Sequence, residues 1–140
     1  MDRPRDALGR PLAHGVQGVE PEPEVPREPT AALARAQQLL DAGRPFAAHE
    51  VLETAWKAAP PGERDLWQGL AQIAVGITHA LRGNPTGAHR LLVRGAGRVA
   101  PYAGRPPYGI DVGGVLSWTL AAADAVAAGG ELEGLPHLLA

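Results

Sequence analysis

Apolar side chains at helical spacing constrain the fold of this chain more than any other feature. Between residues 63 and 82 they recur every three or four positions, the spacing of one face of an α-helix. Weaker versions of this pattern occupy residues 30–42, 45–58, 85–100 and 111–128. No segment alternates apolar and polar residues as a half-buried strand does. The sequence therefore predicts an all-α fold of about five helices.

Turn and cap residues separate these segments. Thr30 and Asp111 are good N-caps for the first and last predicted helices, since their side-chain oxygens can accept a backbone N–H. Gly43 and Gly83 each stand two residues before a proline. Glycine ends a helix readily and proline is tolerated in a first turn. Such short connections predict a compact bundle of antiparallel helical hairpins.

The two glycine–proline turns are part of a partial self-match. Shifting the sequence by 40 residues places Gly43-Arg-Pro-Phe-Ala-Ala-His49 over Gly83-Asn-Pro-Thr-Gly-Ala-His89. A helix, a turn and a second helix in each unit are typical of tetratricopeptide-like repeats. The matched residues are mostly Gly, Pro and Ala, which also recur by chance in this composition. His89 holds the position of His49 without the flanking acids.

Composition divides the chain of 140 residues into three parts and limits its partners. Residues 16–29 alternate proline with acid and residues 1–29 hold no periodic apolar pattern, so residues 1–29 predict a disordered arm. Residues 30–128 predict one helical domain, and residues 129–140 predict a tail that docks Leu135, Leu138 and Leu139. The net charge of −2 argues against a protein built to coat nucleic acid or an anionic membrane. No signal peptide or spanning segment is visible. With no cysteine in the chain, a cytoplasmic location is the simplest expectation.

The richest candidate site lies in the predicted helix from Pro45 to Ala58. His49, Glu50 and Glu53 stand there among mostly apolar neighbours. His49 and Glu53 are four residues apart and share one face. Glu50 points about 100° away from His49, so it does not share that face.

Three interpretations of these side chains stay open. A zinc-protease helix needs His-Glu-x-x-His, and here Glu53 replaces the second histidine, which leaves His49 and Glu53 as weak metal ligands. In an enzyme, Glu50 or Glu53 would act as general base, and His49 and His79 would be acid–base groups. In a structural cluster, the register of a hairpin with its turn at residues 60–61 sets Glu53 opposite a glutamine at 68 and His49 opposite one at 72. Hydrogen bonds would then satisfy these buried groups.

A second candidate is a row of arginines in the fourth predicted helix. Arg90, Arg94 and Arg98 recur every four residues, and with Arg82 and Arg105 they could form a stripe for phosphate or an acidic partner. A solvated helix face explains the same spacing. Since no aromatic residues are interleaved with these arginines, nucleic acid is not an expected partner.

Several separated motifs follow one another along the chain. They are Ala48-His-Glu-Val-Leu-Glu-Thr-Ala-Trp56, Trp67-Gln-Gly-Leu-Ala-Gln72, His79, Gly83-Asn84 with Gly87-Ala88, and Tyr108-Gly-Ile-Asp111. In this order, over about residues 31–128, the chain resembles the domain-of-unknown-function 309 family of bacteria and archaea. The resemblance implies a compact all-helical domain and supplies no activity. Its signature positions are His49, Glu50, Glu53, Trp56, Gln68, Gln72, His79 and Asn84.

These observations favour an interaction module over an enzyme. The leading hypothesis is a non-enzymatic helical domain that binds an unknown partner protein or associates with itself, because the hairpin pattern is present and the catalytic set is incomplete. The alternative is an enzyme or a small-ligand pocket, in which Gln68 and Gln72 would orient a substrate beside His49, Glu53 and His79. No cofactor is expected in either case.

Overall fold

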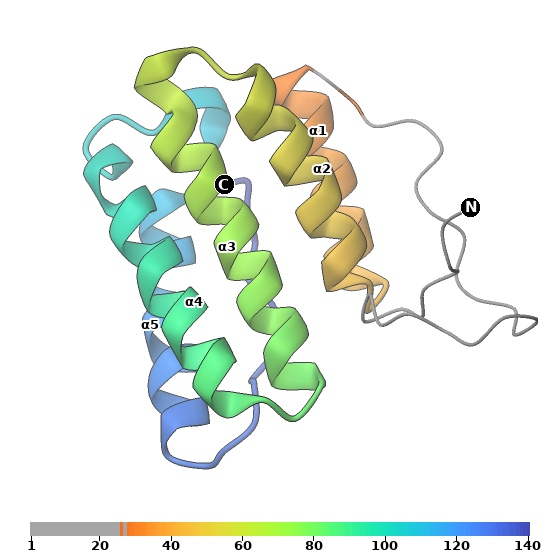
Figure 1. The fold of residues 1–140 in the computed structure, drawn as a ribbon. Helices are drawn as coiled ribbons and strands as arrows, with labels where there is room; N and C mark the ends of the chain where they lie inside the picture. The colour runs from red at the N-terminus through yellow and green to blue at the C-terminus, as the bar shows by residue number, and fades with distance from the viewer. Residues whose placement is uncertain (1–25, 27) are drawn as a thin grey trace, which may run out of the picture.

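Five α-helices and three short 3₁₀ turns form the described part of the chain in the computed structural model. This part comprises residue 26 and residues 28–140, so the expected arm over residues 1–29 lies almost entirely outside it. The prediction of an all-α fold is confirmed (Figure 1). The helices are α1 (Pro29–Asp41), α2 (Pro45–Ala58), α3 (Arg64–Leu81), α4 (Pro85–Val99) and α5 (Val112–Ala127). The 3₁₀ turns are η1 (Pro61–Glu63), η2 (Ala100–Tyr102) and η3 (Pro107–Gly109).

The helix starts follow the cap residues at α4 and α5 but not at α1. The side-chain oxygens of Asn84 and Asp111 each accept a hydrogen bond, at 3.1 Å, from the backbone N–H three residues on. Thr30 was expected to cap α1, and this prediction is wrong, because the helix already begins at Pro29. The fixed φ of a proline at the first position favours that earlier start.

The α1–α2 and α3–α4 turns share one geometry. Gly43 and Gly83 adopt left-handed φ angles of 73° and 79°, a conformation that costs glycine nothing. The next residue in each turn donates its N–H to a carbonyl five residues earlier, at 2.8 Å for Arg44 and 2.9 Å for Asn84. The predicted helix stops are therefore confirmed, and the wider tetratricopeptide-like repeat stays a prediction.

Each helix packs mainly against its neighbours in the chain, with α3 between α2 and α4 (Figure 1). Glycines permit the closest of these approaches. A Cβ built on Gly69 would lie 2.8 Å from Val99 and 2.9 Å from the carbonyl oxygen of Gly95, and one on Gly76 would lie 2.9 Å from Leu92. Since Cβ atoms do not approach so closely, the backbones of α3 and α4 lie nearer than alanine would allow.

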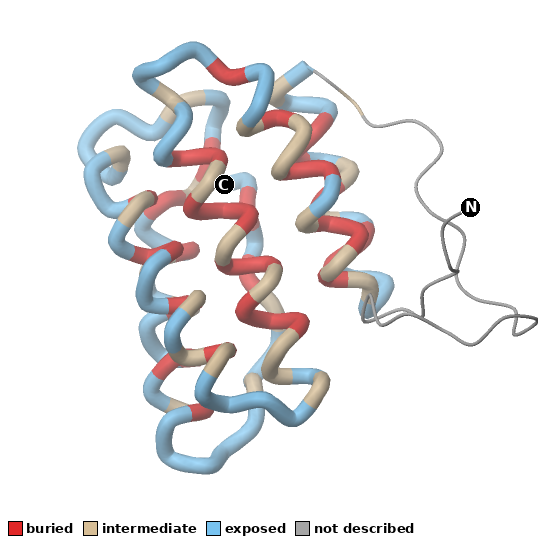
Figure 2. Tube along the Cα trace, viewed as in Figure 1, coloured by how far each residue is buried: buried red, intermediate tan, exposed pale blue. Residues whose placement is uncertain are grey.

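Burial follows the inward faces of the helices (Figure 2). Along α3 the buried side chains include Leu66, Leu70, Ile73 and Ile77. Leu81 was expected on the same face but is 49% exposed, because α3 ends there and the bundle no longer covers it. Among the described residues, the helices lack the length and apolar character that crossing a membrane requires.

The C-terminal residues return along the bundle. They pass behind α3 in the view of Figure 1 and connect α1 with the start of α5 through hydrogen bonds. Of the three leucines expected to dock, Leu138 is buried and Leu135 half-buried, while Leu139 is 37% exposed. This segment therefore contributes one leucine fully to the core.

Candidate functional site

A small cleft opens between α2 and α3. Its volume is about 110 Å³, well below the roughly 300–1,000 Å³ of pockets for drug-sized ligands. Most of its lining side chains are half-buried, so the cleft reaches the surface. The lining residues are His49, Glu53, Trp56, Gln68, Ala71, Gln72 and Val75. We call this feature the α2–α3 cleft.

Five of the eight expected site residues meet in the cleft. His49, Glu53 and Trp56 come from α2, and Gln68 and Gln72 from α3. These positions agree with the hairpin register expected from the sequence, which sets His49 near Gln72 and Glu53 near Gln68. The antiparallel pairing of α2 and α3 therefore creates the site.

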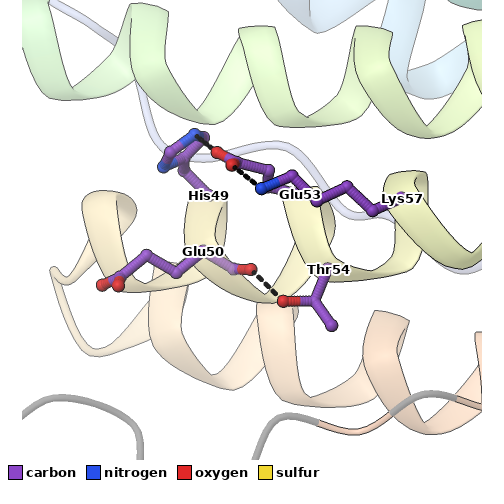
Figure 3. Close-up of polar contacts among 5 residues, drawn as sticks. All are labelled: His49, Glu50, Glu53, Thr54 and Lys57. Carbon is purple, nitrogen blue, oxygen red and sulfur yellow. Dashed lines mark hydrogen bonds and ion pairs between the residues drawn. The ribbon is translucent and has the colours of Figure 1, made fainter.

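An ion-pair chain on α2 forms one wall of the cleft. The His49 Nε2 lies 2.8 Å from Glu53 Oε2, and the Lys57 Nζ lies 2.9 Å from Glu53 Oε1 (Figure 3). All three residues are one turn apart, which brings their side chains together. The hydrogen bond from Lys57 is the main cause that lowers the pKa of the Glu53 carboxyl, against the opposing effect of its partial burial. Glu53 is thus held as a carboxylate.

The expected hydrogen bonds between the helices are not made. Among the described residues, His49 Nδ1 and Gln72 Oε1 are buried atoms without a hydrogen-bond partner. The prediction that Gln72 satisfies His49 is therefore wrong. His49 bonds instead to Glu53 on its own helix, since a side chain one turn away is easier to reach than one on a neighbouring helix.

Both unpaired atoms are acceptors when the imidazole is neutral. The bond to a carboxylate fixes the proton of a neutral ring on Nε2, which leaves Nδ1 of His49 with a lone pair. The amide oxygen of Gln72 has two lone pairs. The cleft therefore combines a carboxylate, two unpaired acceptors and a half-buried indole from Trp56, beside the amide groups of Gln68 and Gln72.

His79 and Asn84 lie outside the cleft and form a helix cap. The Asn84 Oδ1 accepts from the N–H of Gly87 at 3.1 Å, so its amide nitrogen faces His79 Nδ1, also at 3.1 Å. This amide donates to Nδ1, which requires the unprotonated nitrogen there. Burial, and secondly the charge of Arg82, lowers the pKa of His79. The pair stabilises the α3–α4 turn.

Glu50 is exposed and points away from the cleft (Figure 3). Its backbone carbonyl accepts a hydrogen bond from the Thr54 hydroxyl at 3.1 Å. Within residues 28–140, neither a hydrogen bond nor an ion pair involves its carboxylate. Glu50 therefore does not line the α2–α3 cleft.

The arginine row divides into paired and solvated members. The Arg98 guanidinium forms an ion pair with Asp65 of α3 at 2.8 Å, so it ties α4 to α3. Arg90 and Arg94 are exposed. One of the three members thus has a structural partner, which reduces the stripe available to an anion.

A cluster around Glu63 was not expected from the sequence. Its carboxylate accepts hydrogen bonds from the Tyr108 hydroxyl, at 2.8 and 2.9 Å, and from the Trp67 indole at 3.3 Å. Tyr108 has a φ of 56°, a left-handed conformation that is uncommon outside glycine. These bonds hold the loop before α5 onto the start of α3. The hydrogen bond to Glu63 also raises the pKa of Tyr108.

The described residues offer no group of three or more histidine, aspartate and glutamate side chains that could hold a metal ion. His49 and Glu53 are adjacent through their own ion pair. The Lys57 ammonium occupies the other carboxylate oxygen. This position therefore offers a metal ion at most two protein ligands, His49 and Glu53.

The fold and the cleft together define a small five-helix domain with a polar, acceptor-rich cleft between its second and third helices. Residues 33–91 match the model of the domain of unknown function DUF309, so the family resemblance is confirmed over this segment. It contains all eight signature positions, whereas the Tyr108–Asp111 motif lies outside it.

A curated relative matches part of the chain. The "Uncharacterized protein YpuF" of Bacillus subtilis (strain 168) is 46% identical over 48 residues, which are 34% of this chain and 28% of that protein. The aligned part thus spans less than a third of the relative. No solved structure matches the chain.

Proposed function

We propose that this domain is a protein-interaction module whose α2–α3 cleft receives one basic side chain of a partner. The observation that carries the proposal is the pair of buried, unpaired acceptors on His49 and Gln72 beside the Glu53 carboxylate. An unsatisfied buried acceptor costs about 1–3 kcal/mol. A hydrogen-bond donor that enters the cleft removes this cost. Binding is therefore favoured because these acceptors have no partner in the unbound protein. The cysteine-free composition suits a cytoplasmic setting for this interaction.

The chemistry of the cleft favours a guanidinium over other donors. Guanidinium presents several N–H groups in one plane and can bond to more than one acceptor. Its charge complements Glu53, whose lowered pKa keeps the carboxylate ionised. Trp56 adds an indole face, on which cations are favourably placed. The volume of about 110 Å³ suits one side-chain group rather than a whole small molecule.

Lys57 occupies the place of the partner in the free protein. Its ammonium pairs with Glu53, and the Lys57 side chain is 68% exposed. Because an exposed ion pair contributes about 0–1 kcal/mol, an incoming guanidinium can displace it. Replacing Lys57 by methionine is therefore expected to strengthen binding severalfold.

A peptide titration tests this function. The probe is acetyl-Gly-Arg-Gly-amide, with the citrulline peptide as its uncharged match. NMR signals of the Trp56 indole and the His49 ring are expected to shift with a Kd of roughly 1 mM, equivalent to about −4 kcal/mol. The citrulline peptide is expected to bind at least fivefold more weakly, and Gln72→Leu to weaken the arginine peptide.

Glu50→Gln is the matched control. It removes one acid from the same helix outside the cleft, so peptide binding should not change. Equal affinities for the arginine and citrulline peptides would refute recognition of a basic side chain, and so would a lack of shifts with both the natural chain and Lys57→Met.

One observation favours a second function, an acid–base site. Glu53 holds the Nε2 side of His49 and leaves Nδ1 unpaired, which is how a carboxylate orients a histidine base. The base would then be His49 rather than Glu50 or Glu53. Hydrolysis of p-nitrophenyl acetate tests for a reactive imidazole: His49→Gln should lower the rate, and an unchanged rate would remove this candidate.

A further inference from the structure

The chain binds its own C-terminal segment as an extended peptide. The Gln37 side chain on α1 donates to the carbonyl of Pro136 at 3.1 Å and accepts the N–H of Leu138 at 2.8 Å. One amide thus contacts two backbone groups on either side of a single residue. We call the surface between Gln37 and the start of α5 the tail groove.

The other wall of the tail groove also contacts backbone atoms. The N–H of Asp111 donates to the carbonyl of Leu138 at 2.9 Å, and the N–H of Ala140 donates to Gly109 at 3.0 Å. Leu139 forms an antiparallel bridge with Ile110. This pattern is strand addition, in which main-chain hydrogen bonds supply affinity and a few side chains supply specificity.

Two side chains of the segment provide that specificity. Leu138 is 2% exposed and belongs to the hydrophobic core, and Pro136, two residues earlier, is also buried. The residues around them, Glu133 and His137, are exposed. The tail groove therefore recognises an extended segment with leucine two residues after proline.

Two glycine turns return this segment to its own domain. Gly129, directly after α5, has a φ of 83°, and Gly134 has a φ of 64°. Both angles lie in the left-handed region that other residues adopt at a cost. If the Gly129 turn straightens, the segment leaves the bundle with all of its recognition groups intact.

We propose that the tail groove also takes the same segment of a second copy of this chain, and that the domain self-associates by exchanging tails. The contacts in the exchanged state are identical to those within one copy, so only the tether favours the closed form. Such exchange of an identical element is a low-cost route to dimers. The tail groove lies apart from the α2–α3 cleft, and this inference does not depend on the function of that cleft.

Two complementary full-length variants test the exchange. Gln37→Leu damages the groove and leaves the tail intact, whereas Leu138→Asp damages the tail and leaves the groove intact. In a solution of either variant alone, no intact tail can meet an intact groove, because every copy carries the same damage. Their mixture contains one intact tail and one intact groove, so light scattering should show a 1:1 complex in the mixture that binds at least tenfold more tightly than either variant binds itself.

Circular dichroism shows whether both variants stay helical. If they do, a monomeric mixture overturns the proposal. If either one unfolds, Gly129→Val decides in the otherwise natural chain, because a β-branched residue disfavours the left-handed turn. A larger dimer fraction than that of the natural chain supports exchange, and a monomer at every concentration tested overturns it.

Discussion

Replacing Gly95 by alanine is expected to destabilise the bundle, although alanine is the better helix former. A Cβ on Gly95 would lie 2.6 Å from Ile73 Cγ1, 2.7 Å from the carbonyl oxygen of Gly69 and 3.1 Å from the backbone nitrogen of Ile73. The side-chain atom can rotate away. The two backbone atoms can move only if α3 and α4 separate along their closest approach.

The net effect follows from two opposed contributions. Alanine in place of glycine within a helix stabilises by about 1 kcal/mol. Forcing an extra methyl group into a packed core costs about 1–3 kcal/mol. Because the methyl group of Gly95→Ala would meet backbone atoms, we expect a cost near the upper end of this range. The expected net loss is therefore about 1–2 kcal/mol, equivalent to a fall in Tm of roughly 5–10 °C for a domain of this size.

Gly97→Ala on the same helix is the matched control. A Cβ there meets no atom within 4 Å, so the variant should gain about 0.4–1 kcal/mol. Urea unfolding followed by circular dichroism measures both free energies. If Gly95→Ala is as stable as Gly97→Ala, α3 and α4 do not approach as closely as the structure shows, and the reasoning fails.

Three further outcomes are expected. His79 has a lowered pKa in the fold, so its contribution to stability is complete above its ordinary pKa of 6.5 and is lost as pH falls from that value through the lowered pKa of the folded state. His79→Gln should weaken this pH dependence in urea unfolding at pH 5–7, and a constant difference from the natural chain contradicts it. Tyr108→Phe removes the hydrogen bonds to Glu63 and should lower the free energy of unfolding by about 1–2 kcal/mol; an unchanged value refutes this. Glu50→Gln, at an exposed carboxylate, should stay within about 0.5 kcal/mol of the natural chain, and a larger loss would reveal a partner for it.

The helices were predictable because their signals are local. Apolar spacing placed α3, and glycine with proline placed the ends of α1 and α3 and the starts of α2 and α4 to within one residue. The start of α1 was misplaced at Thr30, since a cap preference there competes with the proline before it. Boundaries depend on such small differences between neighbouring residues, whereas the existence of a helix depends on the whole segment.

The membership of the cleft was predictable, and its hydrogen bonds were not. Helix spacing and hairpin register suffice to set His49 opposite Gln72. Whether their side chains bond depends on fractions of an ångström between two helices, which spacing does not determine. Lys57 was overlooked, although its position four residues after Glu53 is the usual signal for a helical ion pair.

The leucines of the C-terminal segment predicted that it docks, but its hydrogen bonds had no sequence signal. Gln37 and Leu138 are 101 positions apart, and no periodicity relates them. An isolated glutamine on a predicted helix resembles any solvated residue. Only the return path of the chain after Gly129 shows that this side chain binds a backbone.

Gln37 and Gln72 show where the fold favours stability and where it does not. Both are half-buried glutamines on helices. The amide of Gln37 has partners for its nitrogen and its oxygen, while the buried oxygen of Gln72 has none among the described residues. Because such an acceptor costs about 1–3 kcal/mol, a leucine at position 72 would be the more stable choice if the cleft served packing alone. Gln72→Leu should therefore raise the free energy of unfolding while it weakens binding of the arginine peptide, and a loss of both would assign Gln72 to structure instead.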